Sequence, residues 1–292
     1  MQRRGLLAGL TAFPIAPPTA IGAPVAVVAS FSILADMTRQ IAGDSAQVIS
    51  LVPPDGDPHV YQPTAADSRA LNRAAVLVEN GLGLEGWIAR LSHAAGFAGV
   101  RAVASEGVAP RRIGGGMVDP HAWQDPRNGS VYIKNIAASL IAADPPRQEL
   151  YRAAAARFAA GIEATDAWIA AQFAAIPPTA RRIVTTHDAF GYYGDRYGVT
   201  FLAAEGLATD AEPSARAIAA LVAQIKREKI RAVFLENMAD PRIAAMLASE
   251  TGAVLSGPVF ADALSPPGGK APDYLAMLRH NTALFVRALG PA

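Results

Sequence analysis

Three histidines stand in short loops whose neighbouring residue types suit the binding of a metal ion. His121 lies in residues 118–128, VDPHAWQDPRN, where two Asp-Pro steps disfavour helix at the residue before each proline. His59 lies in a similar stretch, DPHVY at residues 57–61, and His187 follows an apolar run that is typical of a strand. Imidazole nitrogen is a common ligand of zinc and other transition metals in proteins. These loops therefore predict a metal site.

Composition limits which residues can complete this site. The chain contains no cysteine, which excludes disulfides, thiolate ligands, cysteine nucleophiles and a lipid anchor attached to cysteine. Any further ligand must then be a histidine, an aspartate or a glutamate. Asp262, which follows a late strand, is the candidate, and Glu205, at the end of another strand, is its alternative.

Length and charge define the broad class of protein. The 292 residues are enough for one large or two medium domains with proper cores. Hydrophobic residues make up 51% and charged residues 17%, as in a globular protein. The 26 basic and 25 acidic residues give a net charge of +1, so there is no electrostatic reason to expect a nucleic-acid partner.

The first 23 residues read as a signal peptide. The basic stretch Met1–Arg4 precedes the short apolar stretch Gly5–Phe13, and small residues near position 23 offer cleavage sites. The Arg3-Arg4 pair hints at a twin-arginine export route, with the general secretory route as the alternative. No later apolar run reaches the roughly 18 residues that a membrane span needs. We therefore expect a soluble periplasmic protein without a lipid anchor.

Apolar runs alternate with amphipathic stretches along the rest of the chain. Strands are predicted at residues 25–31, 47–52, 75–78, 100–104, 183–186, 199–203, 232–235 and 253–255. Helices are predicted at residues 33–42, 64–74, 85–95, 131–143, 147–175, 214–229 and 276–289. Thr64 is expected to cap the second helix, with Asp67 at the capping-box position. This alternation predicts the α/β class, with parallel sheets covered on both faces.

The helix predicted at residues 147–175 divides the chain. It contains no proline and only one glycine, so it should be continuous and roughly 40 Å long. We expect a first α/β lobe over residues 24–144, a rigid linking helix over 145–177 and a second α/β lobe over 178–292. Ligands of open α/β sheets bind at the carboxyl ends of the strands. The three histidines and Asp262 should therefore converge in the cleft between the lobes.

Four segments together resemble the metal-binding solute-binding proteins of bacterial ABC transporters for zinc and manganese. They are GDPHVYQPT at 56–64, DPHAWQDP at 119–126, THDAF at 186–190 and DALS at 262–265. The resemblance covers essentially the whole mature chain. It implies two (β/α) lobes joined by one long helix, and it implies that the metal ligands are His59, His121, His187 and Asp262.

The resemblance also indicates the metal and the partners. Three imidazoles with one carboxylate look like the zinc pattern of the family, whereas members that prefer manganese often carry a carboxylate where His187 stands. The implied function is capture of Zn²⁺ and its delivery to the permease of an ABC transporter, with a manganese receptor as the alternative. A metallochaperone is a candidate donor of the ion, and we expect a monomer.

Two features of the sequence depart from the family. Gln62 stands where the first motif usually has glutamate, and residues 111–116, RRIGGG, replace the histidine-rich loop of many zinc-binding members. A role of that loop in metal capture is therefore not carried over to this chain.

Two other classes of function have requirements that differ from those of a metal receptor. A zinc-dependent hydrolase keeps one coordination position open for water, beside a general base. Four protein ligands would close the shell, and the sequence has no His-Glu-x-x-His helix, Gly-x-Ser-x-Gly elbow or phosphate loop, so we expect no enzyme. A receptor for an organic solute would need a cleft lined by aromatic or arginine side chains.

The residues around the motifs have predicted supporting roles. His93 and His280 lie within predicted helices, without a motif, and should be structural residues with ordinary hydrogen-bond partners. Trp123 should pack beside the site and exclude water. Asp125 and Asp188 are the expected acceptors for the imidazole N–H groups that face away from the metal.

Overall fold

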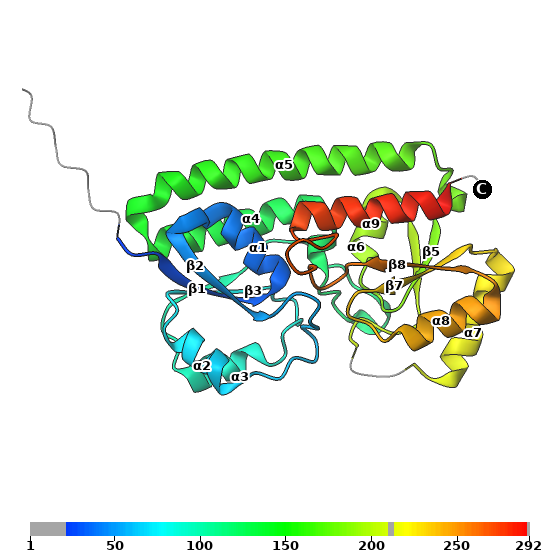
Figure 1. Cartoon of the computed structure of the whole chain (residues 1–292), viewed down its shortest axis with the longest axis horizontal. Coiled ribbons are helices and arrows are strands. Elements are labelled where there is room, and N and C mark those ends of the chain that lie inside the picture. The colour runs from blue at the N-terminus through cyan, green and yellow to red at the C-terminus, as the bar shows by residue number, and fades with distance from the viewer. Residues whose placement is uncertain (1–21, 210–212, 291–292) are drawn as a thin grey trace, which may run out of the picture.

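Two parallel four-stranded sheets, one from each half of the chain, form the centre of the protein (Figure 1). This computed structural model describes residues 22–209 and 213–290. The predicted signal peptide, residues 1–23, lies outside the described residues apart from its last two positions. The predicted α/β class, with two lobes built on parallel sheets, is confirmed.

The first sheet has the strand order β2-β1-β3-β4, and all its pairings are parallel. Its strands are β1 Val25–Phe31, β2 Ala46–Val52, β3 Val76–Glu79 and β4 Val100–Val103. The helices of this half are α1 Ser32–Ala42, α2 Ala65–Asn72, α3 Ile88–Ala95 and α4 Pro126–Ala143. Since helices cover both faces, the central strands are almost entirely apolar, as in the VAVVASF sequence of β1.

The second sheet repeats the topology of the first, with the strand order β6-β5-β7-β8 and parallel pairings. Its strands are β5 Arg182–Thr185, β6 Thr200–Ala203, β7 Ala232–Glu236 and β8 Val254–Val259. The helices of this half are α6 Gly191–Tyr197, α7 Ala215–Glu228, α8 Pro241–Thr251 and α9 Tyr274–Leu289. Because the strands of each sheet are parallel, their carboxyl ends lie at one edge of that sheet. The loops that follow these ends are where ligand sites form in such folds.

One long helix, α5 Gln148–Ala174, runs alongside both halves (Figure 1). Its 27 residues correspond to about 40 Å. It packs against α1 and α4 of the first half and against α6 and α9 of the second. Its buried side chains include Tyr151 and Phe158 toward one end and Ile169 and Phe173 toward the other. The predicted linking helix is confirmed, and its packing on both halves makes it a brace between them.

Local capping signals explain where several helices begin. Thr64 and Asp67 form the predicted capping box: the Asp67 backbone N–H donates to Thr64 Oγ1 at 3.3 Å, and the Thr64 backbone N–H donates to the Asp67 carboxylate at 2.6 Å. Helix α4 begins five residues earlier than predicted, because Asp125 caps it and accepts a hydrogen bond from the backbone N–H of Arg127 at 2.9 Å.

Two helices, α6 and α8, are not predicted by the sequence pattern. Helix α6 has only seven residues and includes Gly191 and Gly194, which weaken its intrinsic helix propensity. Helix α8 does carry a start signal, because Asp240 caps it and Pro241 occupies its first turn. Within the described ranges, no helix is long and apolar enough to cross a membrane.

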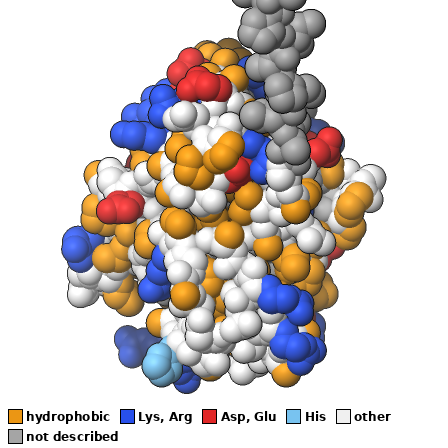
Figure 2. Space-filling model, turned by 90° about the vertical axis from the view of Figure 1, so that its left-hand side faces the viewer, with side chains coloured by type: hydrophobic (Ala, Val, Ile, Leu, Met, Phe, Trp, Pro, Cys, Tyr) orange, Lys and Arg blue, Asp and Glu red, His pale blue; other side chains and the backbone are white. Residues whose placement is uncertain are grey.

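Charged side chains are interspersed at the end of the molecule that carries the first sheet. Figure 2 shows acidic and basic groups of this face separated by apolar and uncharged ones. This face therefore offers no broad basic surface of the kind that nucleic acid requires.

The brace formed by α5 predicts that the two lobes move little. A continuous helix packed on both lobes resists hinge bending more than a pair of loops does. Addition of Zn²⁺ to the metal-free protein should order loops near the site and leave the radius of gyration nearly unchanged in solution X-ray scattering. A large compaction on addition of zinc would contradict this expectation.

Candidate metal centre

The four predicted site residues, His59, His121, His187 and Asp262, come together between the two sheets. One possible ligand atom from each lies within 4.8 Å of all the others. His59 Nε2 is 3.2 Å from His121 Nε2 and 3.1 Å from Asp262 Oδ2, and His187 Nε2 is 3.1 Å from the same carboxylate oxygen. We call these residues the His₃Asp cluster.

Each member of the His₃Asp cluster comes from a segment near the edge of a sheet where the carboxyl ends of its strands lie. His59 lies in the loop after β2, and His187 lies two residues after β5. His121 directly precedes a 3-10 turn that leads into α4, and Asp262 follows β8 by three residues. The cluster thus joins two residues from each half of the chain, in the arrangement that the sequence predicts.

His121 is oriented by a carboxylate only two residues away. Asp119 Oδ1 accepts a hydrogen bond from the His121 backbone N–H at 3.0 Å and lies 2.8 Å from the ring atom Nδ1. The other oxygen of Asp119 is 3.1 Å from the Arg111 guanidinium. With Nδ1 held by a carboxylate, Nε2 is the ring nitrogen that faces the cluster, which is the usual arrangement behind a metal-bound histidine.

His187 is oriented by Glu236, a buried residue at the end of β7. The His187 ring atom Nδ1 forms an ion pair with Glu236 Oε2. The other carboxylate oxygen of Glu236 accepts from the His187 backbone N–H at 2.9 Å and from Thr186 Oγ1 at 2.7 Å. Glu236 therefore fixes both the backbone and the ring of His187.

The predicted acceptors for the imidazole N–H groups, Asp125 and Asp188, were wrong. The role belongs to Asp119 and Glu236, while Asp125 caps α4 and pairs with Arg127. In the sequence, the feature that could have identified Glu236 as an acceptor is its place at the carboxyl end of a predicted strand. Its proximity to His187 depends on the pairing of β7 with β5, which the sequence pattern alone does not give.

Trp123 closes the apolar side of the His₃Asp cluster, as predicted. Its ring centroid lies 5.3 Å from that of His121 and 5.1 Å from that of Phe31. The indole Nε1–H donates to the carbonyl oxygen of Ala261 at 3.0 Å. This bond ties the segment before Asp262 to the loop that carries His121, and the fully buried indole excludes water from that side.

The segment that carries Asp262 is held against the first half of the chain. The backbone N–H of Leu264 donates to Ser32 Oγ at 3.0 Å, and the backbone N–H of Tyr274 donates to Asp36 at 2.9 Å. Ser32 and Asp36 lie on α1. The position of Asp262 in the cluster therefore depends on contacts between residues more than 200 positions apart in the sequence.

Attraction between opposite charges dominates the electrostatics of the cluster. Burial raises the pKa of the Asp262 carboxyl, but the positive charges of His187 and His121 outweigh it and hold that pKa well below its ordinary value. Burial lowers the pKa of His121, but Asp262 and the hydrogen bond with Asp119 outweigh it and raise that pKa to about 9. For His187, the charges of Glu236 and Asp262 outweigh burial, and its pKa lies well above the ordinary value.

The buried atoms of the cluster are suited to a cation. Asp262 Oδ1 and His187 Nε2 are buried, and neither forms a hydrogen bond with the residues that the structure describes. His187 Nε2 lies in an ion pair with Asp262 Oδ2 at 3.1 Å and Asp262 Oδ1 in one with His121 Nε2 at 3.6 Å, but a buried polar atom without a hydrogen bond is still costly. Three imidazole nitrogens and a carboxylate oxygen at this spacing can satisfy one divalent ion in a tetrahedral shell.

The remaining candidate residues lie outside the His₃Asp cluster. His93 is exposed on α3, and His280 Nε2 lies 2.9 Å from the carbonyl oxygen of Pro258. The hydrogen bond of His280 agrees with its predicted structural role, whereas for His93 the structure shows only that it lies outside the cluster. Glu205, the predicted alternative to Asp262, follows β6 and lines a cavity beside the cluster rather than joining it.

Three comparisons with known proteins bear on this site. Residues 27–288 match the family ZnuA, described as zinc-uptake complex component A, periplasmic. The chain is 32% identical over 269 residues to the manganese-binding lipoprotein MntA of Halalkalibacterium halodurans, covering 92% of this chain and 89% of that protein. It is also 32% identical over 269 residues to the iron ABC transporter substrate-binding lipoprotein MtsA of Streptococcus pyogenes, covering 87% and 86%.

A solved structure shares the whole fold. The periplasmic zinc-binding protein TroA of Treponema pallidum superposes with a TM-score of 0.88 at 27% identity, over 92% of this chain and 100% of that one. The two-lobe arrangement of this chain is therefore the fold of known solute-binding proteins, and the three similar proteins are named for three different metals.

The geometry predicts a graded series of binding defects. Replacing His59, His121 or His187 by alanine should each weaken Zn²⁺ binding by more than the roughly 10–100-fold that loss of a hydrogen bond behind a ligand costs. Glu236→Gln, which keeps the His187 ring but removes the charge behind it, should fall within that 10–100-fold range. Calorimetric titration of each variant tests this order, with the exposed His93→Ala as the matched control. Wild-type binding in any two of the three ligand variants would disprove this ligand set.

The raised pKa values predict that metal binding releases protons. His121, with a pKa of about 9, and His187, with a pKa well above the ordinary value, are protonated at pH 7 in the metal-free protein, whereas imidazole must be neutral to bind a metal. The affinity for Zn²⁺ should therefore rise as the pH is raised from 7 toward 9. The heat of binding at pH 7 should depend on the ionisation enthalpy of the buffer, with release of about two protons per ion. Identical heats in phosphate and Tris would contradict the prediction.

Proposed function

This chain belongs to the ZnuA family of periplasmic zinc-uptake components, and from that premise we propose that it captures Zn²⁺ outside the cytoplasm and delivers it to the permease of an ABC transporter. The observation that carries the proposal is the convergence of three imidazoles and one carboxylate at a buried point between two lobes. Such a site can enclose a single ion, and the lobes on either side offer surfaces to a membrane partner. The roles of His59, His121, His187 and Asp262 as ligands are part of this proposal.

The donor atoms favour zinc. Zn²⁺ has no ligand-field preference and accepts four ligands with mixed nitrogen and oxygen donors. Mn²⁺ prefers more ligands and harder, oxygen-rich ones, and it stands below zinc in the general affinity order. Glu205, a carboxylate that would add such an oxygen, lies outside the His₃Asp cluster. A manganese receptor is the second candidate, because MntA, at 32% identity, is named as manganese-binding.

A binding role fits the site better than catalysis does. Four protein donors leave no position for the water that a catalytic zinc activates. The two carboxylates behind the cluster, Asp119 and Glu236, already hold the rings of His121 and His187, so neither is free to act as a general base. We therefore propose a receptor and no enzymatic activity.

The proposal extends to export and partners. The proposal places the mature protein in the periplasm as a soluble monomer, with an ABC transporter permease as partner and a metallochaperone as a candidate source of the ion. The similar proteins MntA and MtsA are named lipoproteins, whereas these 292 residues include no cysteine. The absence of a lipid anchor and the boundaries of the linking helix at residues 145–177 remain predictions.

Competition between metals tests the assignment of zinc. Metal-free protein equilibrated with limiting Zn²⁺ and a large excess of Mn²⁺ should retain mostly zinc when the bound metal is measured after gel filtration, because site geometry and affinity order agree. Asp262→Ala should leave a three-histidine site that binds zinc more weakly but still binds it. Retention of mostly manganese by the wild-type protein would contradict the proposal in favour of the manganese alternative.

A further inference from the structure

A cavity of about 430 Å³ opens in the second lobe beside the His₃Asp cluster. His187 lines it. The other lining residues include some that follow the carboxyl ends of β6 and β7 and some in the first turns of α8. Asp57, from the loop that carries His59, also lines the cavity. This cavity therefore connects the edge of the second sheet with a member of the cluster.

Among the residues that the structure describes, three carboxylates line this cavity, and their bonding partners differ. Asp240 caps α8 and pairs with the Arg242 guanidinium at 2.6 Å. Asp57 accepts the His59 backbone N–H at 2.8 Å with one oxygen and Thr209 Oγ1 at 2.6 Å with the other. Both of these carboxylates are thus engaged in holding the backbone or a neighbouring side chain.

Of these three described carboxylates, Glu205 is the one whose side chain remains available. Its backbone N–H donates to the carbonyl oxygen of Thr186 at 2.9 Å, which fixes Glu205 next to the segment that carries His187. Its side chain forms no hydrogen bond or ion pair with any residue in the described ranges. The side chain is partly exposed, so water and ions can reach it.

His187 lies at the inner end of this cavity. Its side chain is 1% exposed, and both ring nitrogens lie in ion pairs, Nδ1 with Glu236 and Nε2 with Asp262. The apolar side chains of Ile218, Ile243 and Met246 also line the cavity. Negative charge within low-dielectric walls concentrates cations from solution.

We propose that this cavity is the route by which the metal ion enters and leaves the site, with Glu205 holding the hydrated cation before it reaches His187. The inference rests on the proposed function and adds to it a residue that controls the rate of binding. A carboxylate oxygen accepts hydrated zinc and hydrated manganese alike. Glu205 therefore sets how fast ions arrive, while the His₃Asp cluster sets which ion is retained.

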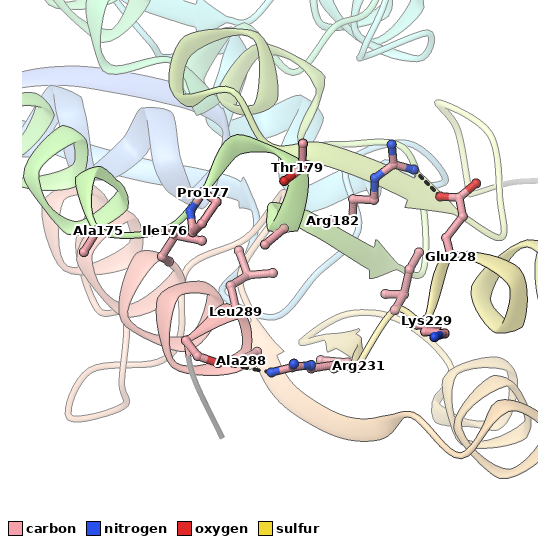
Figure 3. Close-up of a pocket in the computed structure, with 14 residues that line it drawn as sticks. Ala175, Ile176, Pro177, Thr179, Arg182, Glu228, Lys229, Arg231, Ala288 and Leu289 are labelled. Carbon is pink, nitrogen blue, oxygen red and sulfur yellow. Dashed lines mark hydrogen bonds and ion pairs between the residues drawn. The ribbon is translucent and has the colours of Figure 1, made fainter.

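A second cavity offers a contrast at the opposite ends of the same strands. It has a volume of about 490 Å³ and lies where β5 and β7 begin, near the ends of α5 and α9 (Figure 3). Arg182, Lys229 and Arg231 line it, and its carboxylate, Glu228, is paired with Arg182. The excess of positive charge there repels cations, so its larger volume does not make it a route for metal.

The rate of zinc association in Glu205→Gln tests the proposal. Stopped-flow mixing with Zn²⁺ should show association and dissociation each slowed about tenfold, with little change in Kd, because the lost charge acts on the path rather than on the final site. Added salt should slow the wild-type protein more than this variant. Glu163→Gln, an exposed position on α5, removes the same charge far from the cavity and should behave like wild type.

The outcomes separate this inference from the proposed function. Equal rates of zinc association and dissociation in Glu205→Gln and Glu163→Gln would overturn the proposed route. A weaker Kd with unchanged association would make Glu205 a ligand of the final site and would also overturn it. Failure of the wild-type protein to bind zinc at equilibrium would contradict the proposed function itself.

A physical block provides an independent test, because the chain has no native cysteine. Ala239→Cys places a thiol on the wall of the proposed route, and Thr179→Cys places one in the second cavity. Labelling with a bulky maleimide should slow zinc exchange in the Ala239→Cys protein and leave it unchanged in the Thr179→Cys protein. Thermal melts of labelled and unlabelled proteins verify folding, and unchanged exchange in labelled, folded Ala239→Cys protein would overturn the proposal.

Discussion

The structure depends on the cost of burying a charged carboxylate. Asp262 is fully buried, and one of its oxygens has no hydrogen-bond partner among the described residues. Such a group is tolerated only when positive charge lies close to it. His187 and His121, whose pKa values are raised, supply that charge while protonated, and a divalent ion can supply it in their place. The carboxylates of Asp119 and Glu236, which orient two of these rings, act to maintain this balance.

The architecture places this balanced cluster where two copies of one topology meet. Each four-stranded sheet delivers loops at its carboxyl edge, and the long helix α5 packs on both halves. Contacts of Leu264 and Tyr274 with α1 tie the segment of Asp262 to the first half. The cluster is therefore assembled by rigid elements and by the loops that they anchor, which suits a site that must select and enclose a small ion.

The fold and the donor atoms determine different properties of the protein. Proteins named for manganese, iron and zinc share about 30% identity with this chain over most of its length. The fold they share is compatible with all three metals, so the choice of metal must come from the side chains at the site. Under the proposed function, the His₃Asp cluster sets the selection, and the cavity beside His187 sets the rate of exchange.

The sequence by itself determined the strands, the long helix and the four members of the cluster, but not helices α6 and α8. Apolar runs, proline positions and the Thr64 cap act over a few residues, so the strands, α5 and the loops that carry the histidines are visible in the sequence. Only the tertiary structure decided which carboxylates serve them. Glu236 is 49 residues from His187 and meets it through the pairing of β7 with β5, while Glu205, also at a strand end, remains outside the cluster. Such neighbours depend on sheet register and lobe packing, which no local pattern specifies.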